Sequence, residues 1–269
     1  MINLENIKTY KEPYTHFIID EAFSNKDFEN MVSEFPNNEL FGNSQGGVNT
    51  NRKCVANTAK NNIFDDWIES APTWKKFYEY LNSPQMIQDM FPLFMDEFRK
   101  YGSKLDLSQL NIDVNGPKNF DFNSAAQELY QTGTNKDQNN LWIQLDMLRA
   151  YDGYKREIHH DMHYRVINFL AFFSDAEGDG GEFRIHDNLE ETAMADHARQ
   201  PSGIHNTDDS RYPVVKSIKP QKNKLLGFVS SPNSYHSVSE LKNYEGFRDF
   251  IYVGISCKGA MAWHKNGID

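Results

Sequence analysis

The sequence predicts an α+β fold whose core is a jelly-roll, a double-stranded β-helix made of two packed antiparallel sheets. Before residue 140, apolar residues recur mostly at helical spacing. From Leu141 onward, short runs with strand patterning alternate with turn-rich clusters. Eight such runs are the number that a jelly-roll requires, and its two sheets enclose a pocket. We therefore expect a β core with an N-terminal helical elaboration and a lid-like insertion.

The composition fits one folded, aromatic-rich domain. The 269 residues include 19 Phe and 13 Tyr, and 39% of the chain is hydrophobic, which argues against disorder. We expect residues 1–140 to form a strand and helix elaboration that packs on a double-stranded β-helix core of residues 141–269.

Charge and cysteine content limit the partners and the compartment. The net charge of −10 and the pI of about 5.4 disfavour nucleic acid and anionic membrane surfaces as partners. Cys54 and Cys257 give no disulfide framework. No window approaches a signal peptide or the ~20 apolar residues of a membrane span. We expect a cytoplasmic protein.

The N-terminal part is predicted to contain one strand and three helices. Residues 14–20 form the strand, and Ser24 is the N-cap of a helix that ends before Pro36. Two further helices are predicted over residues 67–81 and 83–101.

Two segments of this part carry little periodicity. Residues 37–62 are rich in Asn and Gly and are expected to form a loop. This loop is either a surface connection or part of a substrate rim, the rim candidates being Asn49, Asn51, Arg52 and Lys53. Residues 102–140 are polar, with at best a short helix over 124–130.

The C-terminal part is predicted to be β throughout. Residues 188–211 interrupt the strands, are too long for a hairpin loop, and would lie at the mouth of the pocket as a lid. The predicted strands cover residues 141–151, 155–161, 165–173, 181–185, 214–218, 224–230, 234–239 and 247–258.

One strand carries a pattern suited to metal binding. His159 and Asp161 are separated by one residue, so their side chains project to the same face of a strand. His236 supplies a third candidate ligand. Two His and one carboxylate leave coordination positions open, as in non-heme Fe(II) oxygenases. The alternatives are that these are surface and turn residues, or that His163 replaces His159; His160 should point away.

Four consecutive segments resemble the Fe(II)/2-oxoglutarate-dependent oxygenase superfamily, nearest to its prolyl-4-hydroxylase-like branch. They are YDGYKREIHHD, FLAFFSDAEGDGGEF, NKLLGFVSSPNSYHSV and FRDFIYVGI, in chain order. The resemblance implies Fe(II) on His159, Asp161 and His236, 2-oxoglutarate as co-substrate, dioxygen as oxidant and ascorbate as a stimulant. It implies hydroxylation of an unactivated C–H bond, with release of succinate and CO2. The substrate would be a small polar molecule, such as a free amino acid, or a peptidyl side chain.

The resemblance also assigns the 2-oxoglutarate contacts. Arg248 follows His236 by twelve residues, where the family has the basic residue that binds the distal carboxylate, and a guanidinium matches a carboxylate with two parallel donors. The family often has Arg-x-Ser, which is absent here, so Tyr151 is the leading hydroxyl donor unless it is a core tyrosine. Arg165 and Asn168 stand where relatives have Arg-x-x-Thr and are assigned jointly to 2-oxoglutarate or substrate. Further substrate contacts, each equally compatible with packing, are Trp142, Tyr164, Arg184 and His186.

Other activities remain open at this stage. Desaturation or ring closure would use the same site, whereas halogenation is disfavoured because Asp161 is present. The alternative of another class is a cupin-like jelly-roll that binds a metal or a small ligand without redox turnover. Such modules usually carry three or four His ligands. The substrate identity, the stereochemistry and the oligomeric state do not follow from the sequence.

Overall fold

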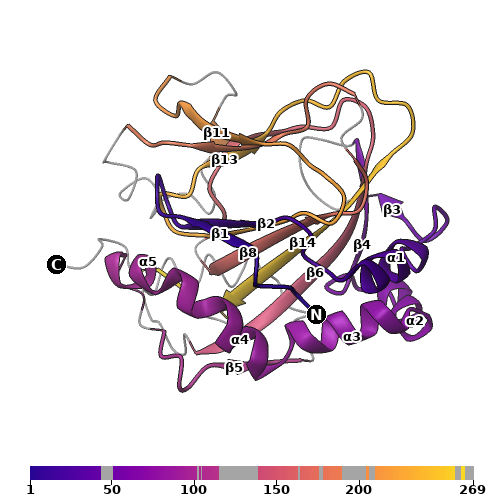
Figure 1. The fold of residues 1–269 in the computed structure, drawn as a ribbon, viewed down its shortest axis with the longest axis horizontal. Coiled ribbons are helices and arrows are strands. Elements are labelled where there is room, and N and C mark those ends of the chain that lie inside the picture. Colours follow the sequence, from indigo (N-terminus) through magenta and orange to yellow (C-terminus); the bar gives the residue numbers. More distant parts are fainter. Residues whose placement is uncertain are drawn as a thin grey trace.

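The computed structural model describes residues 1–43, 51–101, 103, 105–114, 139–162, 164–175, 178–189, 204–205, 210–257 and 262–263. Two β-sheets lie face to face, and the helices cover the outer face of the larger sheet (Figure 1). Most of the predicted lid, the predicted helix over 124–130, Asn49 and His163 lie outside the described residues.

The larger sheet, here called the main sheet, contains strands from both parts of the chain. Except for β5, which is parallel to β6, its strands pair antiparallel. Its strand order is β1 (Ile7–Tyr10), β2 (His16–Ile19), β12 (Leu225–Val229), β8 (Arg165–Phe172), β14 (Arg248–Cys257), β6 (Asn140–Ala150), β4 (Arg52–Ala56) and β3 (Gly42–Asn43), with β5 (Asn111–Ile112) beside β6.

The second sheet, here called the small sheet, is antiparallel. Its order is β10 (Ile204–His205), β7 (Arg156–His159), β13 (His236–Val238), β9 (Phe183–His186) and β11 (Val214–Ile218). All eight predicted strands form. Four of them, β6, β8, β12 and β14, lie in the main sheet, and the other four, β7, β9, β11 and β13, lie in the small sheet. This is the jelly-roll arrangement, and the predicted fold class is confirmed.

Two helices, α1 and α4, begin at their predicted capping residues, and the predicted helices are shorter or divided. The Ser24 hydroxyl accepts a hydrogen bond from the Asp27 amide at 3.2 Å at the start of α1 (Asn25–Ser33). The helix predicted over 67–81 is two helices, α2 (Ile63–Ser70) and α3 (Pro72–Leu81). Pro72 has no N–H to continue α2 and begins α3 instead.

Proline also divides the helix predicted over 83–101. Ser83 caps α4 (Pro84–Met90), as predicted. A 3₁₀ turn, η1 (Phe91–Phe94), then contains Pro92 and leads into α5 (Met95–Lys100). Proline removes an i to i−4 hydrogen bond, which explains the break.

The loop predicted over 37–62 is partly wrong, because it contains β3 and β4. Strand β4 pairs with β6 over five positions, from Arg52 opposite Ala150 to Ala56 opposite Asp146. Only Val55 of this strand is a buried hydrophobic residue, so the sequence carried little strand signal. Its polar residues are tolerated near the edge of the sheet.

Aromatic side chains join the helices to the outer face of the main sheet. Trp74 of α3 is fully buried and lies 5.0 Å from Phe173, measured between ring centroids. Phe17 of β2 lies 5.9 Å from Phe94 of η1. Burying each such side chain stabilises the fold by about 1.5–3 kcal/mol. The helices therefore pack against the outer face of the main sheet, and its inner face lies opposite the small sheet.

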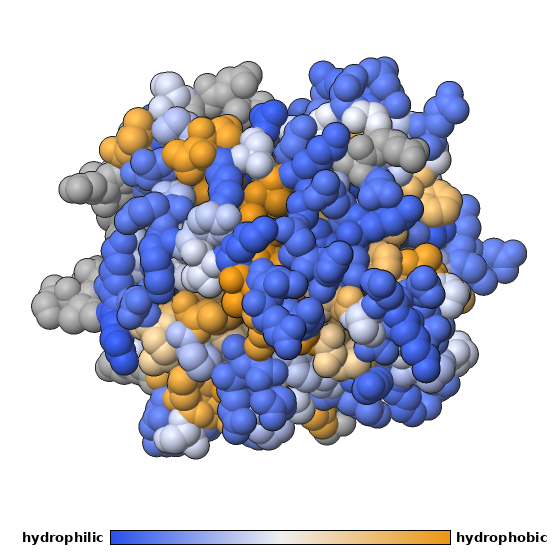
Figure 2. All heavy atoms as spheres, viewed as in Figure 1, coloured by the Kyte–Doolittle hydropathy of each residue, from blue (hydrophilic) through white to orange (hydrophobic). Residues whose placement is uncertain are grey.

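Hydrophilic residues cover most of the surface seen in Figure 2, with hydrophobic residues in scattered patches between them. None of the helices in the described part of the chain combines the length and hydrophobicity that a membrane span needs.

Candidate active site

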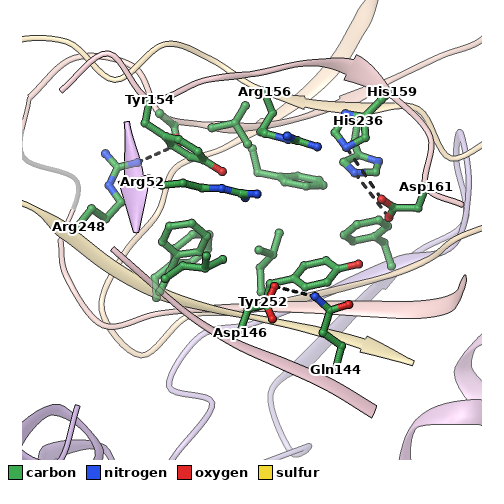
Figure 3. Close-up of a pocket in the computed structure, with 18 of the residues that line it drawn as sticks. Arg52, Gln144, Asp146, Tyr154, Arg156, His159, Asp161, His236, Arg248 and Tyr252 are labelled. Carbon is green, nitrogen blue, oxygen red and sulfur yellow. Dashed lines mark hydrogen bonds and ion pairs between the residues drawn. The ribbon is translucent and has the colours of Figure 1, made fainter. Parts of the chain in front are cut away.

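A cavity of about 240 Å³ lies between the two sheets. Side chains from β4, β6, β8 and β14 of the main sheet and from β7, β9 and β13 of the small sheet line it (Figure 3). Aliphatic and aromatic side chains, among them Leu148, Leu170, Phe172 and Phe250, form part of its wall. The remaining wall is strongly polar, and the polar side chains fall into three groups.

The first group is His159, Asp161 and His236, at one end of the cavity. His159 ends β7 and His236 begins β13, where the two residues are direct cross-strand partners. One ligand atom of each of the three residues lies within 4.8 Å of the others. His159 Nε2 is 4.0 Å from Asp161 Oδ1, and His236 Nε2 is 3.8 Å from Asp161 Oδ2. The structure thus brings together the three side chains that the sequence predicted as metal ligands.

Both imidazoles are held in the tautomer that suits a metal ligand. His159 Nδ1 donates to the Glu157 carbonyl at 2.7 Å, and His236 Nδ1 donates to the Ser234 carbonyl at 2.9 Å. A carbonyl can only accept, so each Nδ1 carries the hydrogen and each Nε2 presents a lone pair toward Asp161. Burial lowers the pKa of both histidines, which keeps the rings neutral.

Asp161 is oriented by a chain of hydrogen bonds from the main sheet. The Tyr252 hydroxyl donates to Asn168 Oδ1 at 2.7 Å, and Asn168 Nδ2 donates to Asp161 Oδ2 and to Ser230 Oγ. Burial raises the pKa of Asp161, but nearby positive charges, among them Arg165 and Arg156, outweigh it, and the net shift is downward. The carboxylate is therefore ionised. Asn168 is fully buried and orients Asp161, and its predicted contact with 2-oxoglutarate or substrate stays a prediction.

The second group is Arg248 with Gly181. Arg248 Nη1 donates to the Gly181 carbonyl at 3.0 Å, whereas Arg248 Nε and Nη2 are buried and have no hydrogen-bond partner among the described residues. Burial lowers the pKa of Arg248. Buried polar groups are rarely left unpaired, because each costs about 1–3 kcal/mol. A carboxylate in the cavity would pair with these donors, so the guanidinium fits the distal end of 2-oxoglutarate.

Gly181 is required for this placement. Its φ of +70° is a left-handed conformation that favours glycine. A Cβ at this position would lie 2.2 Å from Arg248 Nη1. The glycine therefore allows the guanidinium to approach the backbone.

The third group comes from β4, β6 and β7 and was largely missed by the sequence. Arg52, expected at a substrate rim, points into the cavity, as does Arg156 from the opposite sheet (Figure 3). Asp146 accepts a hydrogen bond from Gln144 at 2.8 Å through Oδ2, but its buried Oδ1 has no partner among the described residues. Burial raises the pKa of Asp146 to about 6. The available signal was the alternation of β6, in which Gln144 and Asp146 separate apolar residues.

Arg165 lines the cavity as predicted but is extensively engaged. Its Nη1 donates to Ser256 Oγ at 2.9 Å, and its Nη2 donates to Gln144 Oε1. Trp142 and Tyr164 do not line the cavity; their rings lie 5.4 and 5.5 Å from the Arg165 guanidinium carbon. These two residues pack against Arg165 rather than meeting a substrate.

Tyr151 does not reach the cavity. Its hydroxyl donates to Asn38 Oδ1 at 3.3 Å in an exposed position, and Tyr154 lines the cavity instead. The cause is the turn at Gly153, which has a φ of +80° and separates the two tyrosines. In the sequence, the Asp-Gly pair between Tyr151 and Tyr154 was the available signal for this turn.

Arg184 and His186 of β9 also lie outside the cavity lining. Phe183 of the same strand lines it. Both ring nitrogens of His186 are engaged, Nδ1 with the Tyr212 carbonyl at 2.7 Å and Nε2 with Ser237 Oγ at 2.7 Å. Strand alternation accounts for this arrangement. Phe183 and Ile185 project to one face of β9, and Arg184 and His186 project to the other face.

Comparison with known proteins gives structural matches alone. No protein-family model and no curated protein matches the sequence. Solved structures that are similar to the chain include 2-oxoglutarate/Fe(II) oxygenases. A prolyl 4-hydroxylase from Phytophthora capsici aligns with a TM-score of 0.47 and 12% identity, over 90% of this chain and 58% of that one.

Two other similar structures are an oxidoreductase and a protein with 2-oxoglutarate bound. The 2OG-Fe(II) oxygenase family oxidoreductase from Burkholderia pseudomallei has a TM-score of 0.30 and 13% identity, over 53% of this chain and 56% of that one. HygX from Streptomyces hygroscopicus, with nickel and 2-oxoglutarate bound, has a TM-score of 0.45 and 11% identity, over 93% and 85%. The chain thus spans less than two thirds of the length of the first two proteins.

Proposed function

We propose that the protein is an Fe(II)- and 2-oxoglutarate-dependent dioxygenase that hydroxylates an unactivated C–H bond of a small polar substrate. One observation carries the proposal. A cluster of two neutral imidazoles and one ionised carboxylate lies in the same cavity as a buried guanidinium, two of whose nitrogens have no hydrogen-bond partner among the described residues. Metal ligands of this kind and an anchor for a carboxylate are the two features that such a reaction needs.

The three ligands would be His159, Asp161 and His236. Imidazole suits iron, and three protein ligands on one side leave positions for co-substrate and dioxygen. Asn168 and the two backbone carbonyls that hold the Nδ1 atoms fix the ligands before the metal arrives. When bound, Fe(II) and 2-oxoglutarate supply oxidative chemistry that yields succinate, CO2 and a hydroxylated substrate.

The remaining residues bind, orient and shield. Arg248 would hold the distal carboxylate of 2-oxoglutarate, and Gly181 leaves room for it. The aliphatic and aromatic wall restricts water in the cavity, which strengthens the electrostatic contacts inside it. A peptidyl side chain is the alternative substrate, and ascorbate would act as a stimulant. We place the protein in the cytoplasm, without nucleic acid or membrane partners, on its two free cysteines and its net charge of −10.

The test is an anaerobic titration of metal-free protein with Fe(II) and then 2-oxoglutarate. Chelation of 2-oxoglutarate should produce a weak visible charge-transfer band, and admission of oxygen should release succinate. A folded, iron-loaded protein that shows no band would contradict the proposal. It would favour a jelly-roll that binds a metal or small ligand without turnover.

A further inference from the structure

The cavity carries more positive charge than the proposed reaction requires. Among the described residues, four arginines line it, at positions 52, 156, 165 and 248, against the two carboxylates Asp146 and Asp161. No ion pair joins any of these arginines to a described carboxylate. Fe(II) and the dianion 2-oxoglutarate cancel each other's charge, so the loaded cavity keeps an excess of positive side chains. This excess contrasts with the net charge of −10 of the whole chain.

Two of the four arginines have assignments that leave little capacity for another ligand. Arg248 faces the distal carboxylate of 2-oxoglutarate in the function proposed above. Arg165 is bonded to Ser256 and Gln144 and lies beside aromatic rings, with Tyr252 5.6 Å from its guanidinium carbon. Arg52 and Arg156 remain. Burial lowers the pKa of Arg52, but a hydrogen bond with Tyr154 and the nearby charge of Asp146 outweigh it. Neither arginine makes a hydrogen bond to a carboxylate of the described residues.

Arg52 and Arg156 approach the cavity from opposite sheets. Arg52 belongs to β4 of the main sheet and Arg156 to β7 of the small sheet, and both guanidinium groups point into the space between them (Figure 3). Arg156 lies three residues before His159 on β7 and is opposite Val238, which follows His236 by two residues on β13. An anion between these two arginines would therefore lie near the metal position.

We propose that the substrate is an organic acid whose carboxylate is bound between Arg52 and Arg156. This inference rests on the proposed function and names its substrate class. A guanidinium group in a restricted cavity is costly to desolvate unless an anion neutralises it, and the cavity holds more of these groups than carboxylates. A guanidinium fork matches a carboxylate by charge and geometry.

The other side chains and the volume of the cavity indicate the size and polarity of the rest of this substrate. Leu148, Leu170 and Phe172 offer an apolar surface, and the volume of about 240 Å³ lies below the usual ~300–1,000 Å³ of small-molecule sites. The acid should thus be small, with an apolar body.

A carboxylate could also come from the co-substrate. Arg52 and Arg248 are both opposite Ala150, on the two strands that flank β6, so their backbones are two strands apart in the main sheet. The experiment must therefore separate a substrate acid from the distal carboxylate of 2-oxoglutarate.

The first experiment is a calorimetric titration of metal-free Arg248→Met protein with butyrate and with its neutral counterpart butyramide. Removing Arg248 prevents butyrate from binding at the co-substrate anchor. We expect butyrate to bind at least about tenfold more tightly than butyramide, the minimum expected for hydrogen bonds to charged groups. Adding Arg52→Gln or Arg156→Gln should remove this preference. Adding Arg99→Gln, which removes an exposed arginine, should preserve it.

Equal binding of butyrate and butyramide by the Arg248→Met protein would overturn the proposal, as would a preference that survives both cavity substitutions. If Arg248→Met does not fold, wild-type protein loaded anaerobically with Fe(II) and 2-oxoglutarate replaces it, because the co-substrate then occupies the anchor. The same comparison of butyrate and butyramide applies, read as a change in the visible band.

The second experiment measures the 2-oxoglutarate concentration that half-saturates the visible band. Arg52→Gln and Arg156→Gln should change it by less than about threefold, because they are assigned to the substrate. A loss as large as that of Arg248→Met would assign these arginines to the co-substrate and overturn the inference. Absence of the band in the wild type would count against the proposed function alone. The titration with butyrate and butyramide would then show whether Arg52 and Arg156 bind a carboxylate.

Discussion

The two faces of β6 and β14 bury charge in opposite ways. On the outer face, Arg149 and Asp249 are cross-strand neighbours joined by two hydrogen bonds of 2.7 and 2.8 Å, and the Arg149 guanidinium lies 3.6 Å from the centre of the Phe247 ring. On the cavity face, the adjacent residue of β14, Arg248, has two buried nitrogens with no hydrogen-bond partner in the part of the chain that the structure describes. Each charge of the outer pair is matched by the other, whereas Arg248 donates to the Gly181 carbonyl and forms no ion pair with a described carboxylate.

This difference separates residues that stabilise the fold from residues that are available for ligands. Breaking a buried pair is costly because it leaves an uncompensated charge. An unpaired buried charge already carries that cost in the free protein, and a ligand can remove it. The variants below test the comparison, in order of expected effect.

The largest effect should come from the small sheet, where two buried histidines differ in the same way. Both ring nitrogens of His186 are engaged within the chain, whereas Nε2 of His236 faces the candidate metal position. His236→Ala should abolish Fe(II) binding and lower succinate formation by more than ~100-fold, the upper range for losing only an outer partner of a ligand. Equilibrium dialysis under anaerobic conditions measures the iron. The matched control is His186→Ala, since His186 is equally buried but engaged with Tyr212 and Ser237. It should lose stability and still bind iron; iron binding retained in His236→Ala would refute the ligand set.

Arg149→Met should destabilise the protein by about 3–5 kcal/mol, because it leaves Asp249 buried without its partner. Burial already raises the pKa of Asp249, and Arg149 opposes that shift. Urea denaturation at pH 7 measures the change, and anaerobic Fe(II) binding should be unaltered in the folded fraction. A variant as stable as the wild type would mean that the outer pair contributes nothing to folding.

Arg248→Met should leave stability equal or higher but weaken 2-oxoglutarate binding by roughly 10- to 150-fold, or about 1.5–3 kcal/mol. The half-saturation of the visible band measures this. Arg184→Met is the control, because Arg184 lies outside the cavity lining. An unchanged 2-oxoglutarate requirement in Arg248→Met would move the anchor to another arginine.

Asp146→Asn should stabilise the protein by about 1–3 kcal/mol at pH 8, because it removes a buried charge with an unpaired oxygen. Burial raises the pKa of Asp146 from 3.8 to about 6. Ionised Asp146 therefore weakens the folded state progressively as pH rises from about 4 to 6, and the cost is constant above that range. The Tm difference between variant and wild type should grow over this interval. A difference independent of pH would show that Asp146 is not the group that titrates.

The sequence predicted most of the jelly-roll because its strands carry local signals. Alternation and turn clusters identified the eight strands, and the one-residue spacing of His159 and Asp161 identified their shared face. β4 was missed because its one buried hydrophobic residue, Val55, gives no periodic pattern. Its place in the sheet depends on pairing with β6, almost a hundred residues away.

The parts of the site that the sequence missed depend on register and turn geometry. Asn168 was named from the sequence, but its hydrogen bond to Asp161 was not foreseen, because no spacing rule indicates that this residue of β8 meets the carboxylate. Tyr154 replaces Tyr151 because of one left-handed glycine. Arg52 reaches the cavity through long-range pairing. Local patterns therefore located the metal ligands, whereas the surrounding polar residues required the folded chain.

The smallest expected effect concerns the glycine beside Arg248. Gly181→Ala and Gly246→Ala both place a Cβ on a residue with positive φ, +70° and +101°, but the first Cβ would lie 2.2 Å from Arg248 Nη1 and the second meets nothing within 4 Å. Each variant should lose about 1–2 kcal/mol of stability from backbone strain. Only Gly181→Ala should also raise the 2-oxoglutarate concentration that half-saturates the visible band, because its methyl group displaces the guanidinium. An equal rise in both variants would attribute the effect to strain in the connecting segment rather than to Arg248, and no rise in either would show that the cavity accepts 2-oxoglutarate without the observed position of this arginine.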